Sequence, residues 1–132
     1  AAPVYAGTYY AKVQVDKNSN YYEAYSKTVK FTIKKATPVI TAKSASKTVS
    51  YTKLKKAKQT FKLSATATGK NKITFRKTSG SKNIAISKTG TVTVPAKTKK
   101  GTYTIKVKLT TKSSRNYNAA KAKTVTLKVV VK

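Results

Sequence analysis

The sequence predicts an all-β fold: an antiparallel β-sandwich of about seven strands, with an extra β-hairpin before it. Three observations lead to this prediction. Short runs of alternating apolar and polar residues are separated by turn signals roughly every eight to twelve residues. No segment longer than a turn keeps a helical period. The apolar residues are mostly Val, Ile, Ala and Tyr, and Thr fills many other positions, which is typical of strands.

Two stretches of the chain resemble each other, which indicates a repeat. Residues 7–15 read Gly-Thr-Tyr-Tyr-Ala-Lys-Val-Gln-Val and align with residues 101–109, Gly-Thr-Tyr-Thr-Ile-Lys-Val-Lys-Leu, at an offset of 94 residues. Residues 27–33 align with residues 123–129 at an offset of 96, which places a two-residue insertion in the loop between. The chain therefore holds the ends of two successive repeats.

This repeat sets the expected domain boundaries. Residues 1–35 are expected to be the C-terminal hairpin of a preceding repeat, and residues 36–132 to form one complete repeat. Pro38 keeps Thr37 extended, so a short linker rather than a helix should join the two units. Seven strands in about 97 residues is typical of an immunoglobulin-like (Ig-like) domain, so the complete repeat is predicted to be an Ig-like sandwich.

The expected strands of the complete repeat follow one another along the chain. The first is split into two halves, Val39–Thr41 and Val49–Tyr51. Turns are expected at residues 78–81 and 88–90, where Gly supplies a positive φ. The inward-facing residues of the other six strands are, in order, Phe61, Leu63 and Ala65; Ile73 and Phe75; Ile84 and Ile86; Val92 and Val94; Tyr103, Ile105, Val107 and Leu109; and Val125, Leu127, Val129 and Val131.

Four motifs give the chain a resemblance to the Ig-like repeats of Gram-positive bacterial surface proteins. They are the linker Lys35-Ala-Thr-Pro38, the strand start Gly101-Thr-Tyr103, the Asn116-Tyr117 loop and the closing strand 122–132. The resemblance spans essentially the whole chain. It implies an extracellular place on the cell surface or in the cell wall, neighbouring repeats as partners, and a role as a stalk or adhesion unit.

The composition argues against catalysis. The chain has no His and no Cys, so the commonest general base, the commonest transition-metal ligand and the thiol nucleophile are all missing. Its two carboxylates, Asp16 and Glu23, both precede residue 36. The complete repeat therefore lacks a carboxylate pair for hydrolysis, the acidic oxygens of a calcium site, and a carboxylate to assist a Lys–Asn crosslink. We expect no catalytic residue, no metal and no cofactor. No apolar run is long enough for membrane insertion as a helix.

Charge is the most unusual feature of the composition. Thirty Lys and Arg face two acidic residues, for a formal net charge of +28. Because inward-facing residues alternate with outward-facing ones, one sheet should carry a face of Lys, Thr and Arg. Two lysine-rich loops, residues 53–58 and 97–100, should add to it. The candidate polyanion-binding residues are Lys72, Arg76, Lys106, Lys108, Lys128, Lys53, Lys55, Lys56, Lys58, Lys97, Lys99 and Lys100.

Several partners remain open for this basic surface. It can be a solvated face whose lysines only deter edge-to-edge aggregation. It can bind an anionic polymer, such as cell-wall teichoic acid or a sulfated glycan. A non-specific nucleic acid or glycosaminoglycan module, or an accessory domain of an extracellular carbohydrate-active enzyme, are the alternatives. Specific DNA reading is not expected, because only two residues are Arg and no helix is predicted for the major groove.

The N-terminal hairpin raises a separate question. Six of the nine tyrosines lie in residues 1–25, where they favour packing at the junction between repeats over stacking on sugars or bases. An isolated two-stranded hairpin is marginal in water, and Val13, Val15, Phe31 and Ile33 would be exposed on it. We therefore expect it to pack on the complete repeat, or to self-associate through residues 7–33.

Overall fold

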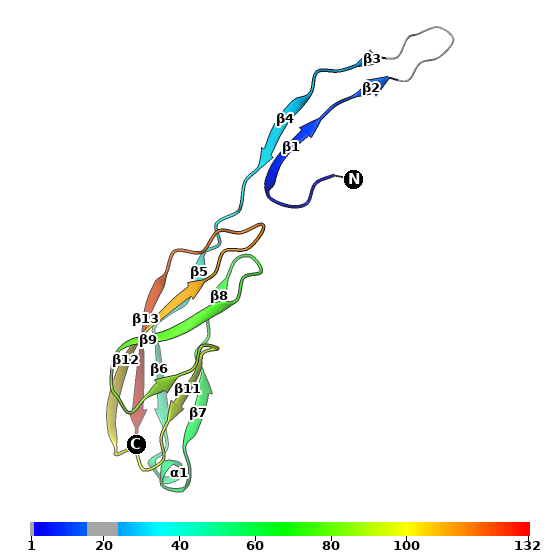
Figure 1. Cartoon of the computed structure of the whole chain (residues 1–132). Coiled ribbons are helices and arrows are strands. Elements are labelled where there is room, and N and C mark those ends of the chain that lie inside the picture. Colours follow the sequence, from blue (N-terminus) through cyan, green and yellow to red (C-terminus); the bar gives the residue numbers. More distant parts are fainter. Residues whose placement is uncertain (1, 16–23) are drawn as a thin grey trace.

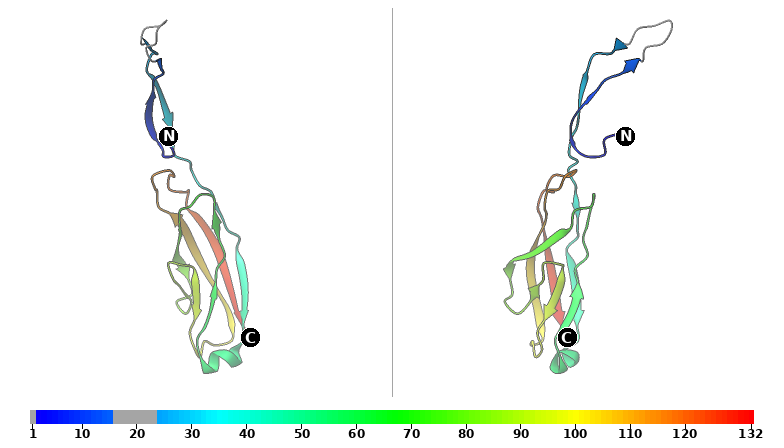
Figure 2. Two further views of the ribbon diagram at one scale, coloured as in Figure 1. Left: turned by 90° about the vertical axis from the view of Figure 1, so that its right-hand side faces the viewer. Right: turned by 45° about the vertical axis from the view of Figure 1, so that its right-hand side comes forward.

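The computed structural model describes residues 2–15 and 24–132 and has two parts arranged end to end (Figure 1). A β-sandwich contains the elements from β5 to β13, and a narrow hairpin of β1 to β4 extends from one end of it (Figure 2). Asp16, Glu23 and the Asn20-Tyr21 pair lie outside the described residues. Apart from one short helix, the regular structure of the described residues is β, as the alternation predicted.

The strands of the sandwich follow the predicted alternating runs. They are β5 (Ile40–Thr41), β6 (Ala45–Val49), β7 (Gln59–Lys62), β8 (Thr66–Ala67), β9 (Ile73–Gly80), β10 (Ala85–Ile86), β11 (Thr91–Val94), β12 (Gly101–Thr111) and β13 (Lys123–Val131). The first expected strand is split into β5 and β6, and the second into β7 and β8. Counting each split strand once leaves seven, so the Ig-like sandwich of about seven strands is confirmed.

Two main sheets face each other in the sandwich. One has the order β6-β13-β12-β9 and the other the order β10-β11-β7. The first strand changes partner along its length, because β5 pairs antiparallel with β8 whereas β6 pairs parallel with β13. The remaining pairings of the described strands are antiparallel. This arrangement leaves β6 at the edge of one sheet and β7 at the edge of the other.

The core lies between these two sheets, and strand alternation explains its composition. On β12, Ile105, Val107 and Leu109 are buried, whereas the intervening Lys106 and Lys108 are exposed. The largest fully buried side chains are Leu54, Ile84, Ile105, Leu109, Leu127, Val92, Val94, Val107 and Val129. Burying each such side chain contributes about 1.5–3 kcal/mol. With no cysteine in the chain, the sandwich depends on this core.

A short helix, α1 (Tyr51–Lys56), corrects two predictions. The second half of the first strand is Ala45–Val49 and not Val49–Tyr51, and the first part of the expected lysine loop is helical. Leu54 is fully buried and anchors α1 to the core. Six residues with one buried apolar side chain cannot display a helical period, which is why the sequence indicated a loop.

The turn predicted at residues 78–81 is also wrong, because β9 continues through Gly80. The glycine is needed for a close approach and not for a turn. Its φ is +107°, and a Cβ there would collide with the carbonyl oxygen of Thr104 and lie 2.6 Å from the Cα of Ile105. A register shift between Lys106 and Val107 accommodates the extra length of β9. The turn at residues 88–90 is present.

The hairpin consists of two short sheets in line. β1 (Gly7–Ala11) pairs with β4 (Val29–Ile33), and β2 (Gln14–Val15) pairs with β3 (Ala24–Tyr25). Its apolar side chains are largely uncovered: Val13 is 65% exposed, Val29 59% and Phe31 39%. The hairpin does not lie against the sandwich but points away from it (Figure 2). Packing on the complete repeat is therefore not what stabilises it.

The register of the hairpin corrects the sequence alignment. Gly7 lies opposite Ile33 on the hairpin, and Gly101 lies opposite Val131 in the sandwich. If Gly7 corresponds to Gly101, then Ile33 corresponds to Val131, at an offset of 98 and not 96. A shift of two residues keeps every side chain on its own face of the strand, so alternation alone cannot detect it.

Candidate polyanion-binding surfaces

Strand pairing brings four of the predicted cations together on the outer face of the four-stranded sheet. Arg76 on β9 lies directly opposite Lys108 on β12. Lys106 lies opposite Thr126 of β13, and Lys128 of β13 lies opposite Thr104. We call Arg76, Lys106, Lys108 and Lys128 the sheet-face cluster. All four side chains are exposed, which follows from the alternation that buries their neighbours.

The electrostatics of this face are unbalanced. Like charges directly opposite each other on a sheet are destabilising, by the same order as favourable pairs stabilise, roughly 0.2–1 kcal/mol. Arg76 and Lys108 form such a pair, and residues 36–132 contain no carboxylate side chain to neutralise it. The residues around them are mostly threonines, including Thr74, Thr110 and Thr124, whose hydroxyls can donate to an anion. An anion between the cations would relieve the repulsion.

Lys72 lies just outside this arrangement. It is exposed and precedes β9, whose pairing with β12 begins at Ile73. It therefore extends the basic face at one end, without a fixed partner across the sheet.

The remaining predicted cations meet at the end of the sandwich that is remote from the hairpin. α1 is tied to the residue 97–100 segment by a hydrogen bond from the Lys97 N–H to the Leu54 carbonyl, 2.8 Å. The ammonium of Lys55 lies 5.1 Å from the centre of the Tyr51 ring and that of Lys100 lies 5.6 Å from it. The end cluster comprises Lys53, Lys55, Lys56, Lys58, Lys97, Lys99 and Lys100.

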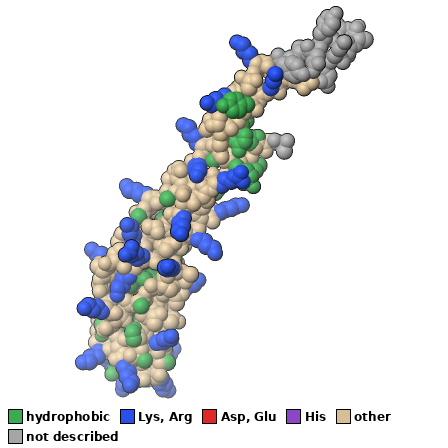
Figure 3. All heavy atoms as spheres, viewed as in Figure 1, with side chains coloured by type: hydrophobic (Ala, Val, Ile, Leu, Met, Phe, Trp, Pro, Cys, Tyr) green, Lys and Arg blue, Asp and Glu red, His purple; other side chains and the backbone are tan. Residues whose placement is uncertain are grey.

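The predicted residues thus form two surfaces instead of one continuous face. The two lysine-rich segments come together around Tyr51, but they lie at the end of the sandwich and not on the sheet face. Figure 3 shows Lys and Arg side chains along the whole length of the visible surface, with no acidic side chain among the described residues. Such spaced point charges suit an extended anionic chain better than one small anion.

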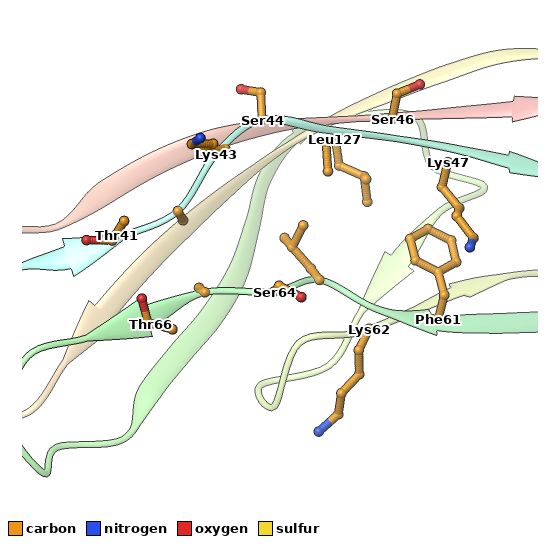
Figure 4. A pocket seen from close by; sticks show the side chains of 14 residues that line it. Thr41, Lys43, Ser44, Ser46, Lys47, Phe61, Lys62, Ser64, Thr66 and Leu127 are labelled. Carbon is orange, nitrogen blue, oxygen red and sulfur yellow. The ribbon is translucent and has the colours of Figure 1, made fainter.

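Sequence reasoning missed a groove between the edge strands of the two sheets (Figure 4). Its volume is about 500 Å³, and it lies between the chain segments around β6 and β7. Leu63 and Leu127 form part of its floor, and Lys43, Lys47 and Lys62 are among its lining residues. No sequence signal could have revealed it, because the two walls come from strands that belong to different sheets.

Lys77 was also missed, and its role is structural. Its ammonium donates hydrogen bonds to the carbonyl oxygens of Ser81 at 2.7 Å and Ile84 at 2.8 Å. These bonds hold the turn between β9 and β10 closed. A lysine that uses two of its three donors in this way is poorly placed to bind an external anion.

Other kinds of site have little support within the described residues. They contain no group of three or more His, Cys, Asp or Glu side chains that could hold a metal. They also contain no helix that is long and apolar enough to cross a membrane.

Comparisons with known proteins bear on the fold alone. No protein-family model matches the chain, and no curated protein matches it in sequence. A solved structure described as the protocadherin gammaB7 EC3-6 cis-dimer is similar in fold. It aligns with 95% of this chain at a TM-score of 0.56 and 10% sequence identity, and the aligned part is 33% of that chain. The chain therefore spans about a third of the length of this structural neighbour, whose repeats share its Ig-like sandwich.

Proposed function

We propose that this chain is a non-catalytic Ig-like repeat module of a bacterial surface protein, and that its sheet-face cluster binds anionic cell-wall polymer. It would act outside the cell as one unit of a stalk or an adhesive array. The observation that carries the binding proposal is the direct opposition of Arg76 and Lys108, with Lys106 and Lys128 on the same face and no carboxylate in residues 36–132. A polymer such as teichoic acid or a sulfated glycan can bridge such cations one after another.

The division into repeats supports the stalk role. Residues 1–35 would be the last hairpin of a preceding unit and residues 36–132 one complete unit. The hydroxyl of Tyr9 donates to the carbonyl of Tyr5 at 2.8 Å, and the hydroxyl of Tyr103 donates to the carbonyl of Lys99 at 2.9 Å. The same side-chain bond to the residue four positions earlier thus occurs at aligned positions of both units. The similarity in fold to a protocadherin repeat agrees with an extracellular adhesion module.

The absence of catalysis in this proposal rests on chemistry. The chain has no His and no Cys, and residues 36–132 have no Asp or Glu. The commonest groups for proton transfer near neutral pH, His, Asp and Glu, are therefore missing there, as is a thiol nucleophile. As an accessory domain of a carbohydrate-active enzyme, the chain would still contribute binding only.

The alternative is a non-specific polyanion module, and binding of three polymers distinguishes it. Teichoic acid, heparin and duplex DNA would be titrated against the full chain at several salt concentrations. We expect teichoic acid to bind at least about tenfold more tightly than DNA at about 0.15 M salt, which corresponds to about 1.4 kcal/mol. Equal affinities that vanish together at moderate salt would show that charge alone is responsible.

Two charge-matched variants then locate the binding surface. One replaces the centre of the sheet-face cluster, Arg76→Gln with Lys106→Gln and Lys108→Gln. The control removes the same charge from exposed positions outside both clusters, Lys70→Gln with Lys82→Gln and Lys88→Gln. We expect the first variant to lose about tenfold in affinity for teichoic acid and the second less than about threefold. Equal losses would contradict a site on the sheet face.

A further inference from the structure

The loop between β12 and β13 holds the segment that leads into the hairpin. The side-chain oxygen of Asn116 accepts a hydrogen bond from the Ala6 N–H at 2.8 Å, and its side-chain nitrogen donates to the Val4 carbonyl at 3.3 Å. One amide thus binds two backbone groups that lie two residues apart. The guanidinium of Arg115 lies over the ring of Tyr5, 3.9 Å from its centre.

The same loop also holds the linker on its way into the sandwich. The Ala36 N–H donates to the Asn116 carbonyl at 2.9 Å, and the Asn118 N–H donates to the Ala36 carbonyl at 2.8 Å. The Asn118 side chain bonds to the Thr37 hydroxyl at 3.0 Å. Residues 115–118 therefore form a clamp at the junction, which binds Val4–Ala6 of the neighbouring unit and the first residues, Ala36 and Thr37, of its own unit.

The structure that the clamp binds recurs at the opposite end of the sandwich. In the hairpin, Gly7 lies opposite Ile33, and the Tyr9 hydroxyl bonds the carbonyl of Tyr5. In the sandwich, Gly101 lies opposite Val131, and the Tyr103 hydroxyl bonds the carbonyl of Lys99. By this correspondence the segment Thr98–Lys100 occupies the place of Val4–Ala6, and Lys132 that of Lys34.

We propose that Thr98–Lys100 is a docking site for the clamp loop of a following repeat unit. An asparagine equivalent to Asn116 would accept from the Lys100 N–H and donate to the Thr98 carbonyl. Among the described residues, neither of these backbone groups has a hydrogen-bond partner; Lys99 and Lys100 are exposed, and Thr98 is held in place by the bond from its hydroxyl to the Pro95 carbonyl and is 6% exposed. This inference rests on the proposed function as a repeat unit, and it names the surface by which one unit orients the next.

Charge makes this docking site selective. Lys99 takes the position of Tyr5, on whose ring Arg115 lies. A following loop with Arg at that place would bring two cations together, whereas a carboxylate there would form an ion pair with Lys99. The site therefore fits a unit whose clamp loop carries Asp or Glu beside its asparagine, and it disfavours a unit identical to this one. Lys99 and Lys100 of the end cluster then belong to a junction and not to a polymer-binding surface.

The clamp can be tested at the junction between the hairpin and the sandwich of this chain. Amide hydrogen exchange at Ala6 would be measured by NMR in the full chain, in Asn116→Ala and in the control Asn83→Ala, an exposed asparagine at the β9–β10 turn. We expect protection of the Ala6 amide to fall at least about fivefold in Asn116→Ala and to stay unchanged in Asn83→Ala. Unchanged protection in Asn116→Ala would overturn the clamp.

A tandem chain tests the docking site. The full chain would be extended after Lys132 by a second copy of residues 35–132, with that copy's loop either unaltered or carrying Arg115→Glu. We expect the Lys100 amide of the first copy to gain at least about fivefold protection in the Arg115→Glu tandem and less in the unaltered one, with the difference shrinking in high salt. No protection in either tandem would overturn the docking site, and equal protection in both would overturn the charge rule.

These results are independent of polymer binding. Teichoic acid binding by the sheet-face cluster is measured on the unextended chain, in which the docking site is empty of any following unit. Loss of the polymer-binding proposal would therefore leave the exchange results standing. A failure of docking would likewise leave the binding results intact.

Discussion

The hairpin β1/β4 and the strand pair β12/β13 begin with the same Gly-Thr-Tyr segment and end in different environments. Both carry the tyrosine bond to the carbonyl four residues earlier. On β12/β13, Ile105 and Leu127 face each other and are fully buried. On β1/β4, Tyr9 faces Phe31 with ring centres 5.7 Å apart, yet Phe31 is 39% exposed. The difference shows that the local sequence specifies the strand pair, whereas burial requires a second sheet.

The largest expected loss of stability is in the buried strand pair, β12/β13. Leu127→Ala should lower the free energy of unfolding by about 2–5 kcal/mol, because it opens a cavity in a closed core. Phe31→Ala should change the unfolding of the sandwich by less than about 0.5 kcal/mol, because its ring lies outside that core. Urea titration of both full-length variants, followed by circular dichroism, checks this. Similar losses in the two variants would mean that the hairpin and the sandwich unfold together.

A smaller effect is expected at the glycines. Gly80→Ala should cost about 1–3 kcal/mol, since φ is +107° and the new methyl group would collide with the Thr104 carbonyl. Gly7→Ala is the control, because a Cβ there meets only the Tyr9 side chain, at an ordinary 3.4 Å. It should change stability by less than about 0.5 kcal/mol. Thermal unfolding of both variants provides the measurement. An unchanged stability of Gly80→Ala would contradict the close approach of β9 and β12.

The smallest effect on stability is expected in the exposed strand pair, β1/β4. A substitution there should instead change the self-association of the chain. We propose that the uncovered face of β1 and β4 meets strands of a neighbouring repeat or, in this chain alone, a second copy. Phe31→Ser should then shift the chain towards monomer while leaving the unfolding of the sandwich unchanged. Light scattering over a range of concentrations would show the shift. A wild-type chain that stays monomeric, with rapidly exchanging amides in the hairpin, would rule out self-association.

Much of the candidate surface could be predicted, because it depends on alternation. Once Ile105 and Val107 were placed in the core, Lys106 and Lys108 had to point outward. Arg76 followed from Phe75 in the same way. Their mutual distance did not follow, because the pairing of Arg76 with Lys108 depends on the register of β9 against β12 and on the irregularity between Lys106 and Val107.

Features that depend on contacts between segments far apart in the sequence could not be predicted from it. α1 has too few residues to show a period, and it forms where Leu54 can enter the core. Lys55 and Lys100 meet at Tyr51 only because the chain folds back at that end. The two hydrogen bonds of Asn116 join residues more than a hundred positions apart. No local pattern encodes such a contact.

The sequence by itself determined the strand alternation, the repeated Gly-Thr-Tyr segment, the sign of the surface charge and the absence of His and Cys. These are properties of single residues or of neighbours along a strand, where side-chain direction follows directly from position. Only the tertiary structure decided which apolar face is covered, why Gly80 must be glycine, and which lysines share a surface. Those outcomes depend on how two sheets pack and on strand register, which a shift of two residues changes without altering the pattern.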